Sequence, residues 1–133
     1  MSSNVIIDKN DKKIIIRLKG MRKIAAMKSK VSFFIKDITG IEHAGSDVEA
    51  RFMNILDIGH LHMIGTKIGN RYYGGSFINM NTSPHEKEFW DVDDPNEAIV
   101  IHLKNEPFKR IYISTKNAKK TIRQFKELIS SGE

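Results

Sequence analysis

Apolar and polar side chains alternate along four segments of the chain. One face of each segment is apolar: Ile14, Ile16 and Leu18; Val31, Phe33 and Ile35; Ile99, Ile101 and Leu103; and Ile111 and Ile113. Successive side chains of a strand point to opposite faces of a sheet, so a period of two is typical of strands with one buried face. The pattern therefore predicts a chain that is rich in β-structure.

Turn-forming residues lie between these strand segments. Asn10 and Asp11 precede the first long strand, and residues 81–84, 93–96 and 105–107 are rich in Asn, Asp and Pro. These residue types favour tight turns, and short turns join antiparallel neighbours. Residues 77–80 and 87–92 are further strand segments in the same series. The spacing predicts consecutive hairpins in a mostly antiparallel sheet.

One amphipathic helix is predicted from residue 117 to about residue 130. Its apolar stripe consists of Ala118, Ile122, Phe125 and Ile129, at the spacing of one helical face. Asn117 can cap the first turn by accepting a hydrogen bond from a free backbone N–H, and Gly132 lies just past the end. We expect Ile122, Phe125 and Ile129 to pack against the sheet.

The middle of the chain has a weaker pattern. Residues 47–56 predict a second helix, because Val48, Phe52 and Ile55 share one helical face, and residues 21–27 predict a short helical turn. Residues 40–75 hold seven of the nine glycines. Glycine at this density is typical of turns and bulges, so we expect this segment to be irregular.

The order of elements and several short motifs resemble a family of small bacterial pleckstrin-homology-like (PH-like) domains. Residues 17–28 resemble the strand, glycine and short helix that open these domains, and residues 35–41 resemble their next strand pair. Residues 65–77, with Gly65-Thr66 and Gly75-Ser76-Phe77, are similar to the glycine-rich block of the family, and residues 88–92 resemble its Phe-Trp strand.

This resemblance covers about residues 11–129. It implies a strongly bent antiparallel sheet, or a partly open β-barrel, capped by one α-helix. Two motifs depart from the family: Gly69-Asn70 stands where a Pro-Gly turn is usual, and residues 115–120 are basic where an acidic, proline-containing stretch is usual. The shared motifs are structural, so they imply a fold and carry little about function.

Length and composition fit one soluble globular domain. The chain has 133 residues, and we expect residues 1–133 to form a single domain with its core at about 11–130. It has no cysteine, which excludes thiol catalysis, disulfides and cysteine-ligated zinc. No apolar run reaches the ~18 residues of a membrane-spanning helix, and the apolar residues 5–7 are too few for a signal peptide. We therefore expect a cytoplasmic protein.

The charge favours anionic partners. Lys and Arg number 22 against 16 Asp and Glu, a net charge of +6. Basic residues gather in two clusters: Arg17, Lys19, Arg22, Lys23, Lys28 and Lys30 near the first strands, and Lys116, Lys119, Lys120 and Arg123 at the start of the last helix. Such side chains donate charge-assisted hydrogen bonds to phosphate. The pattern favours a solvated basic surface, and an anionic membrane surface or a phosphorylated ligand is the alternative.

Other chemistries have weaker signals. His60 and His62 share one face of an extended chain with Asp57 nearby, but further ligands are not evident and His43, His85 and His102 are scattered, so we expect no metal and no cofactor. Tyr72, Tyr73, Phe77 and Arg71 are the candidates for stacking on a nucleic acid, which we rank below an anionic ligand. No nucleophile–base pattern, Gly-x-Ser-x-Gly elbow or phosphate-binding glycine loop is present, so we expect no enzyme.

Together these observations predict a non-enzymatic binding or scaffolding module. Phe89 and Trp90 are adjacent on one strand and face opposite sides; we expect Phe89 in the core and Trp90 partly covered. Ile15 and Phe34 lie on outward faces of neighbouring strands and predict an apolar patch. That patch, with an open sheet edge, predicts weak self-association as a symmetric dimer, or a protein partner.

Overall fold

The structure is a computed structural model, and it describes residues 4–17, 30–44, 60–68, 72–79 and 86–131. These residues form two sheets and one C-terminal helix, so the expected mainly β fold with a C-terminal helix is confirmed. Within the described part of the chain, neither sheet closes on itself.

The first sheet is formed by the N-terminal strands. Its order is β1 (Asn4–Asp8), β2 (Lys13–Arg17) and β3 (Lys30–Phe34), and both pairs are antiparallel. The predicted turn at Asn10 and Asp11 joins β1 to β2, and the Asp8 carboxylate accepts hydrogen bonds from the N–H groups of Asn10 (3.0 Å) and Asp11 (3.1 Å). The sequence pattern missed β1, because its three consecutive apolar residues do not alternate.

The second sheet has six strands. Across the sheet they are β4 (Ile38–His43), β8 (Ala98–Leu103), β9 (Arg110–Ser114), β7 (Glu86–Val92), β6 (Tyr72–Asn79) and β5 (His60–Ile68). The 3₁₀ turns η1 (Ile35–Asp37) and η4 (Pro95–Glu97) precede β4 and β8, and the helix α3 (Ala118–Ser131) follows β9. Part of the segment predicted to be irregular, residues 40–75, is therefore strand: it contains most of β4, all of β5 and the start of β6.

Strand β9 lies between β7 and β8, which corrects one predicted hairpin. β7 pairs with β9 in parallel, so β7 and β8 are not neighbours. Asp93 does not close a turn between β7 and β8; its N–H donates to the Ser114 hydroxyl (3.1 Å) and its carboxylate accepts from that hydroxyl (2.6 Å), which ties the end of β7 to the end of β9. The other strand pairs are antiparallel, so the mostly antiparallel prediction is confirmed.

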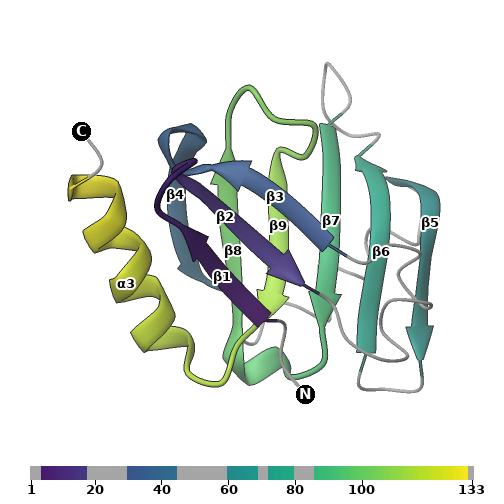
Figure 1. Cartoon of the computed structure of the whole chain (residues 1–133). Helices are drawn as coiled ribbons and strands as arrows, with labels where there is room; N and C mark the ends of the chain where they lie inside the picture. Colours follow the sequence, from purple (N-terminus) through teal and green to yellow (C-terminus); the bar gives the residue numbers. More distant parts are fainter. Residues whose placement is uncertain (1–3, 18–29, 45–59, 69–71, 80–85, 132–133) are drawn as a thin grey trace.

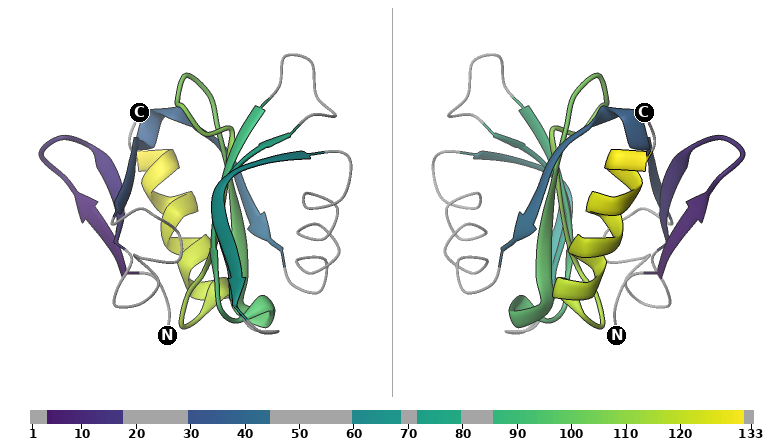
Figure 2. Two further views of the ribbon diagram at one scale, coloured as in Figure 1. Left: turned by 90° about the vertical axis from the view of Figure 1, so that its right-hand side faces the viewer. Right: turned by 90° about the vertical axis from the view of Figure 1, so that its left-hand side faces the viewer.

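The three-stranded sheet lies across one face of the six-stranded sheet, and α3 runs along the side where β4 is the edge (Figures 1 and 2). The space between these elements holds the main hydrophobic core. It contains Ile14, Ile16, Val31, Phe33, Ile38, Ile41, Phe89, Ile99, Ile101, Leu103, Ile111, Ile113, Ala118 and Phe125. The alternating apolar residues of the sequence thus point into one core. Leu18 lies outside the described residues, and Ile35 is half-buried at its border.

The opposite face of the six-stranded sheet is buried as well. There Ala44, Trp90, Val92, Ala98, Val100 and Tyr112 form a second cluster. Trp90 is fully buried and stacks on Tyr112, with 3.8 Å between ring centroids. The expectation that Trp90 is partly covered is therefore wrong, whereas Phe89 lies in the main core as predicted. Both side chains can be buried because β7 is an interior strand with packing on its two faces.

The helix α3 begins and packs as the sequence predicted. Asn117 accepts a hydrogen bond from the N–H of Lys120 (3.1 Å), which caps the first turn. Phe125 is fully buried, while Ile122 and Ile129 are half-buried against the main core. The helices predicted at 21–27 and 47–56, the turn at 81–84 and Gly132 lie outside the described residues.

Candidate anion-binding surface

One side of the three-stranded sheet faces away from the core, and we call it the outer face. Ile14 and Ile16 point into the core, so their neighbours Lys13, Ile15 and Arg17 point outward, and β3 contributes Lys30, Ser32 and Phe34 in the same way. On β1 the strand register places Ile6 and Asp8 beside Ile15 and Lys13. These eight residues make up the outer face: Ile6, Asp8, Lys13, Ile15, Arg17, Lys30, Ser32 and Phe34.

Two of the predicted anion-binding residues are direct neighbours on this face. Arg17 and Lys30 are partners in the β2–β3 register, and both side chains are exposed. In the described part of the chain neither forms an ion pair. Two like charges side by side with no acidic partner attract an anion between them.

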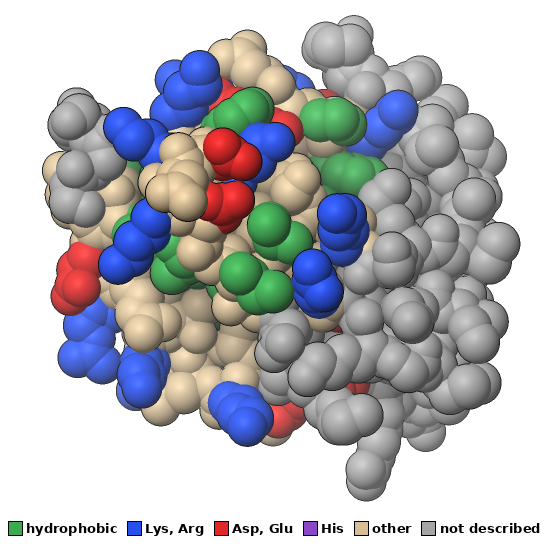
Figure 3. Space-filling view, viewed as in Figure 1, with side chains coloured by type: hydrophobic (Ala, Val, Ile, Leu, Met, Phe, Trp, Pro, Cys, Tyr) green, Lys and Arg blue, Asp and Glu red, His purple; other side chains and the backbone are tan. Residues whose placement is uncertain are grey.

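Exposed apolar side chains lie between the cations. Ile6 is 36% exposed and Phe34 is 39% exposed, and Ile15 is half-buried between them. The ammonium groups of Lys13 and Lys36 lie over the Phe34 ring, at 4.7 and 5.5 Å from its centroid. Figure 3 shows hydrophobic side chains exposed on this side of the molecule, with Lys and Arg side chains to either side of them and acidic side chains next to them toward the upper left.

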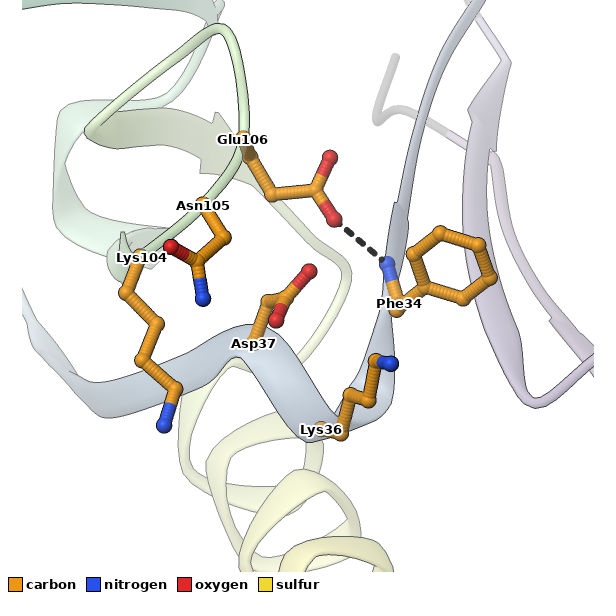
Figure 4. Close-up of a pocket in the computed structure, with 6 residues that line it drawn as sticks. All are labelled: Phe34, Lys36, Asp37, Lys104, Asn105 and Glu106. Atoms are coloured by element: carbon orange, nitrogen blue, oxygen red, sulfur yellow. Dashed lines mark hydrogen bonds between the residues drawn. The ribbon is translucent and has the colours of Figure 1, made fainter.

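A small pocket adjoins the outer face at Phe34. It has a volume of about 460 Å³ and is lined by Phe34, Lys36, Asp37, Lys104, Asn105 and Glu106. Figure 4 shows the carboxylates of Asp37 and Glu106 pointing toward each other from η1 and from the β8–β9 connection. Glu106 accepts a hydrogen bond from the N–H of Phe34 (3.0 Å), which joins that connection to the end of β3.

The electrostatics of the pocket favour the protonated form of Glu106. Burial raises the pKa of Glu106 above its ordinary value, and so do the hydrogen bond with Asp37 and the negative charge of Asp37. The Phe34 N–H and the charge of Lys13 act in the opposite direction without reversing the shift. The pocket is therefore of mixed charge, with the carboxyls of Asp37 and Glu106 and the two cations Lys36 and Lys104 in its lining.

The second basic cluster lies at the start of α3. Lys116, Lys119, Lys120 and Arg123 are all exposed there. The backbone N–H groups of this helix end already have acceptors within the protein: Ala118 donates to the Glu97 carboxylate (2.8 Å) and Lys120 to Asn117 (3.1 Å). Any anion held at this end would depend on the four side chains alone.

The two clusters are on different elements, and no described contact joins them. Lys19, Arg22, Lys23 and Lys28 of the first cluster lie outside the described residues. The candidates for a metal or a nucleic acid are not described in full. The backbone is described, but not the side chain, for His60, His62, Tyr72, Tyr73 and Phe77, and Asp57 and Arg71 lie outside the described residues. Sequence reasoning missed Lys13 and Lys36. The signal for Lys13 was its alternation with Ile14 and Ile16, and the signal for Lys36 was its position two residues after Phe34.

Other polar groups of the described residues are engaged in pairs. His102 bonds to the Glu42 carboxylate (3.0 Å), and His43 to the backbone oxygen of Asn96 (2.9 Å). The described residues hold no group of three His, Asp or Glu side chains that could bind a metal ion. Their one helix, α3, is not long and apolar enough to cross a membrane.

Comparisons with known proteins give this geometry no precedent: no family model, curated protein or solved structure matches the chain. The surface is therefore interpreted from its own residues.

Proposed function

We propose that the protein is a non-enzymatic binding module of the PH-like kind and that the outer face binds an anionic ligand. The observation that carries this proposal is the Arg17–Lys30 neighbour pair, which has no ion-pair partner among the described residues, with Lys13 and Lys36 on the same side of the molecule. A face that serves solubility alone is expected to intersperse both charges, whereas the outer face has three cations and one acidic residue, Asp8.

The architecture supports the PH-like part of the proposal in a general way. Two largely antiparallel sheets enclose one core, and a single C-terminal helix covers an open side of it. The parallel β7–β9 pair departs from a purely antiparallel arrangement. The non-enzymatic part rests on the sequence, in which no nucleophile–base pattern is evident.

Binding of a soluble polyanion tests the proposal. We expect inorganic polyphosphate to bind in isothermal titration and to bind less tightly as salt is added, because exposed charges are screened. Replacing both Arg17 and Lys30 by Gln is expected to weaken binding about tenfold or more. The matched control replaces Lys119 and Lys120 by Gln on α3, removes the same charge, and is expected to have a smaller effect.

Equal losses in both double variants would contradict the assignment to the outer face. Absence of polyphosphate binding by the parent protein would contradict the anionic-ligand function itself.

A further inference from the structure

We infer that the outer face docks on an anionic lipid bilayer, an inference that rests on the anionic-ligand function proposed above. The face combines cations with exposed apolar side chains, and binding of a soluble anion would use only the cations. Arg17 and Lys30 stand at one end of it. At the other end Lys13 lies beside Asp8, and Lys36 of η1 adjoins the face at the Phe34 ring; the apolar side chains lie between the two ends.

Contact with an apolar phase would remove exposed apolar surface of this face from water. Ile6 and Phe34 keep over a third of their surface in water, and Ile15 lies between them on the same face. At a bilayer surface these side chains reach the boundary between headgroups and acyl chains, while the Lys and Arg groups around them contact anionic headgroups. A free phosphate would use the cations and leave the apolar centre in water.

A second copy of the chain fits this face less well. Each strand has five residues, so the three strands offer on the order of 200 Å² of surface. A stable protein interface needs roughly 800 Å² on each partner. A two-fold contact would also bring the cations of one copy against those of the other, with Asp8 as the one acidic residue of the outer face, and its carboxylate already holds the β1–β2 turn.

Vesicle sedimentation tests the inference. The folded 133-residue chain is mixed with vesicles of phosphatidylcholine alone and of phosphatidylcholine with phosphatidylserine. We expect binding to the mixed vesicles only, and weaker binding at high salt. Each cation removed from the outer face is expected to lower the partition coefficient about fivefold. The variant R17Q/K30Q therefore loses more than tenfold, and the control K119Q/K120Q on α3 loses much less.

A separate variant tests the contribution of the apolar side chains to vesicle binding. Ile6→Ser removes an exposed apolar side chain without changing the charge, and we expect it to weaken vesicle binding several-fold while polyphosphate binding stays unchanged. Because Ile6 is on an edge strand and partly exposed, the variant is expected to fold, and its thermal melting curve verifies this.

The outcomes separate this inference from the proposed function. Polyphosphate binding without vesicle binding overturns the membrane inference and leaves the proposed function standing. Equal loss of vesicle binding in R17Q/K30Q and K119Q/K120Q, or full binding by I6S, also overturns it. If vesicles are not bound and R17Q/K30Q increases self-association in sedimentation, the occupant is a second copy of the chain. Absence of binding to either probe removes both proposals.

Discussion

Arg110 is held between two carboxylates of β7 on the second buried face of the large sheet. Its guanidinium donates two hydrogen bonds to Glu88 (2.9 and 2.7 Å) and pairs with Glu86 at 2.8 Å. Burial by itself lowers the pKa of Arg110, but the charge of Glu88 and the hydrogen bonds that Arg110 donates to both carboxylates raise it above its ordinary value. Glu88 is itself almost fully buried and accepts a hydrogen bond from the Trp90 indole N–H (3.2 Å).

This arrangement predicts unequal effects for the two glutamates. Glu88→Gln removes the charge that compensates a partly buried guanidinium, and we expect it to lower the free energy of unfolding by about 2–4 kcal/mol. Glu86→Gln, the matched control, removes a more exposed partner and is expected to cost less than about 1 kcal/mol. Urea unfolding followed by Trp90 fluorescence measures both. Equal costs would show that burial of Glu88 does not govern the strength of this pair.

Phe125 gives the second prediction at the residue scale. Its ring is fully buried in the main core, where α3 meets the sheets. Phe125→Ala is expected to lower the free energy of unfolding by about 3–5 kcal/mol, because burial is lost and a cavity remains. Thermal melting checks this, with exposed Gln124→Ala as the control on the same helix. A Phe125 variant that melts within a few degrees of the parent would contradict the packing of α3.

At the scale of elements, Glu106 joins the β8–β9 connection to the end of β3. It accepts the Phe34 N–H and shares a hydrogen bond with Asp37 of η1. Lys104 donates its own N–H to the Asp37 backbone oxygen (2.9 Å), so this connection also meets η1. The two sheets are therefore linked by a polar cluster at one end, in addition to their shared core.

The raised pKa of Glu106 sets the sign of a pH effect. A carboxyl whose pKa is higher in the folded state binds its proton more tightly there, so its contribution to stability is present below the unfolded pKa, ordinarily near 4.5. That contribution is lost as the pH rises through the higher folded value. Glu106→Gln keeps an oxygen for the Phe34 N–H and removes the ionisation. We expect the melting temperature of the variant, relative to the parent, to increase as the pH rises from about 4 to 7.

Melting curves of both proteins across this pH range make the test, and Glu127→Gln on the exposed side of α3 is the control. A difference between parent and Glu106→Gln that stays constant with pH would show that Glu106 titrates as an ordinary exposed carboxyl.

At the scale of the whole molecule, the structure predicts how the weak self-association of this chain depends on salt. Ile15 and Phe34 do lie on the outward side of neighbouring strands, and Phe34 is exposed. The cations of the outer face repel those of a second copy, and salt screens that repulsion. We therefore expect self-association through this face to appear at high salt and at high concentration, with one 15.2 kDa species at low salt.

Sedimentation at several concentrations and two ionic strengths decides this. A dimer that is stable at low salt and dissociates at high salt would contradict the outer face as its interface, and would direct attention to oppositely charged surfaces elsewhere.

The sequence by itself determined the elements that depend on local spacing. The alternation of β2, β3, β8 and β9 identified their core-facing residues, and the apolar stripe with Asn117 located α3. These features follow from the geometry of a single strand or helix, in which spacing alone decides which side chains share a face. The exposed cations Arg17 and Lys30 were likewise readable as a cluster.

Contacts between distant residues were decided by the tertiary structure. The insertion of β9 beside β7, the burial of Trp90 against Tyr112, and the meeting of Asp37 with Glu106 each join residues that are far apart along the chain or reverse a local expectation. Alternation indicates one buried face, but whether the other face is buried depends on what packs over it. Arg17 and Lys30 give a further example. The sequence indicated that both belong to a basic cluster, but only the strand register showed that they are direct neighbours beside exposed apolar side chains.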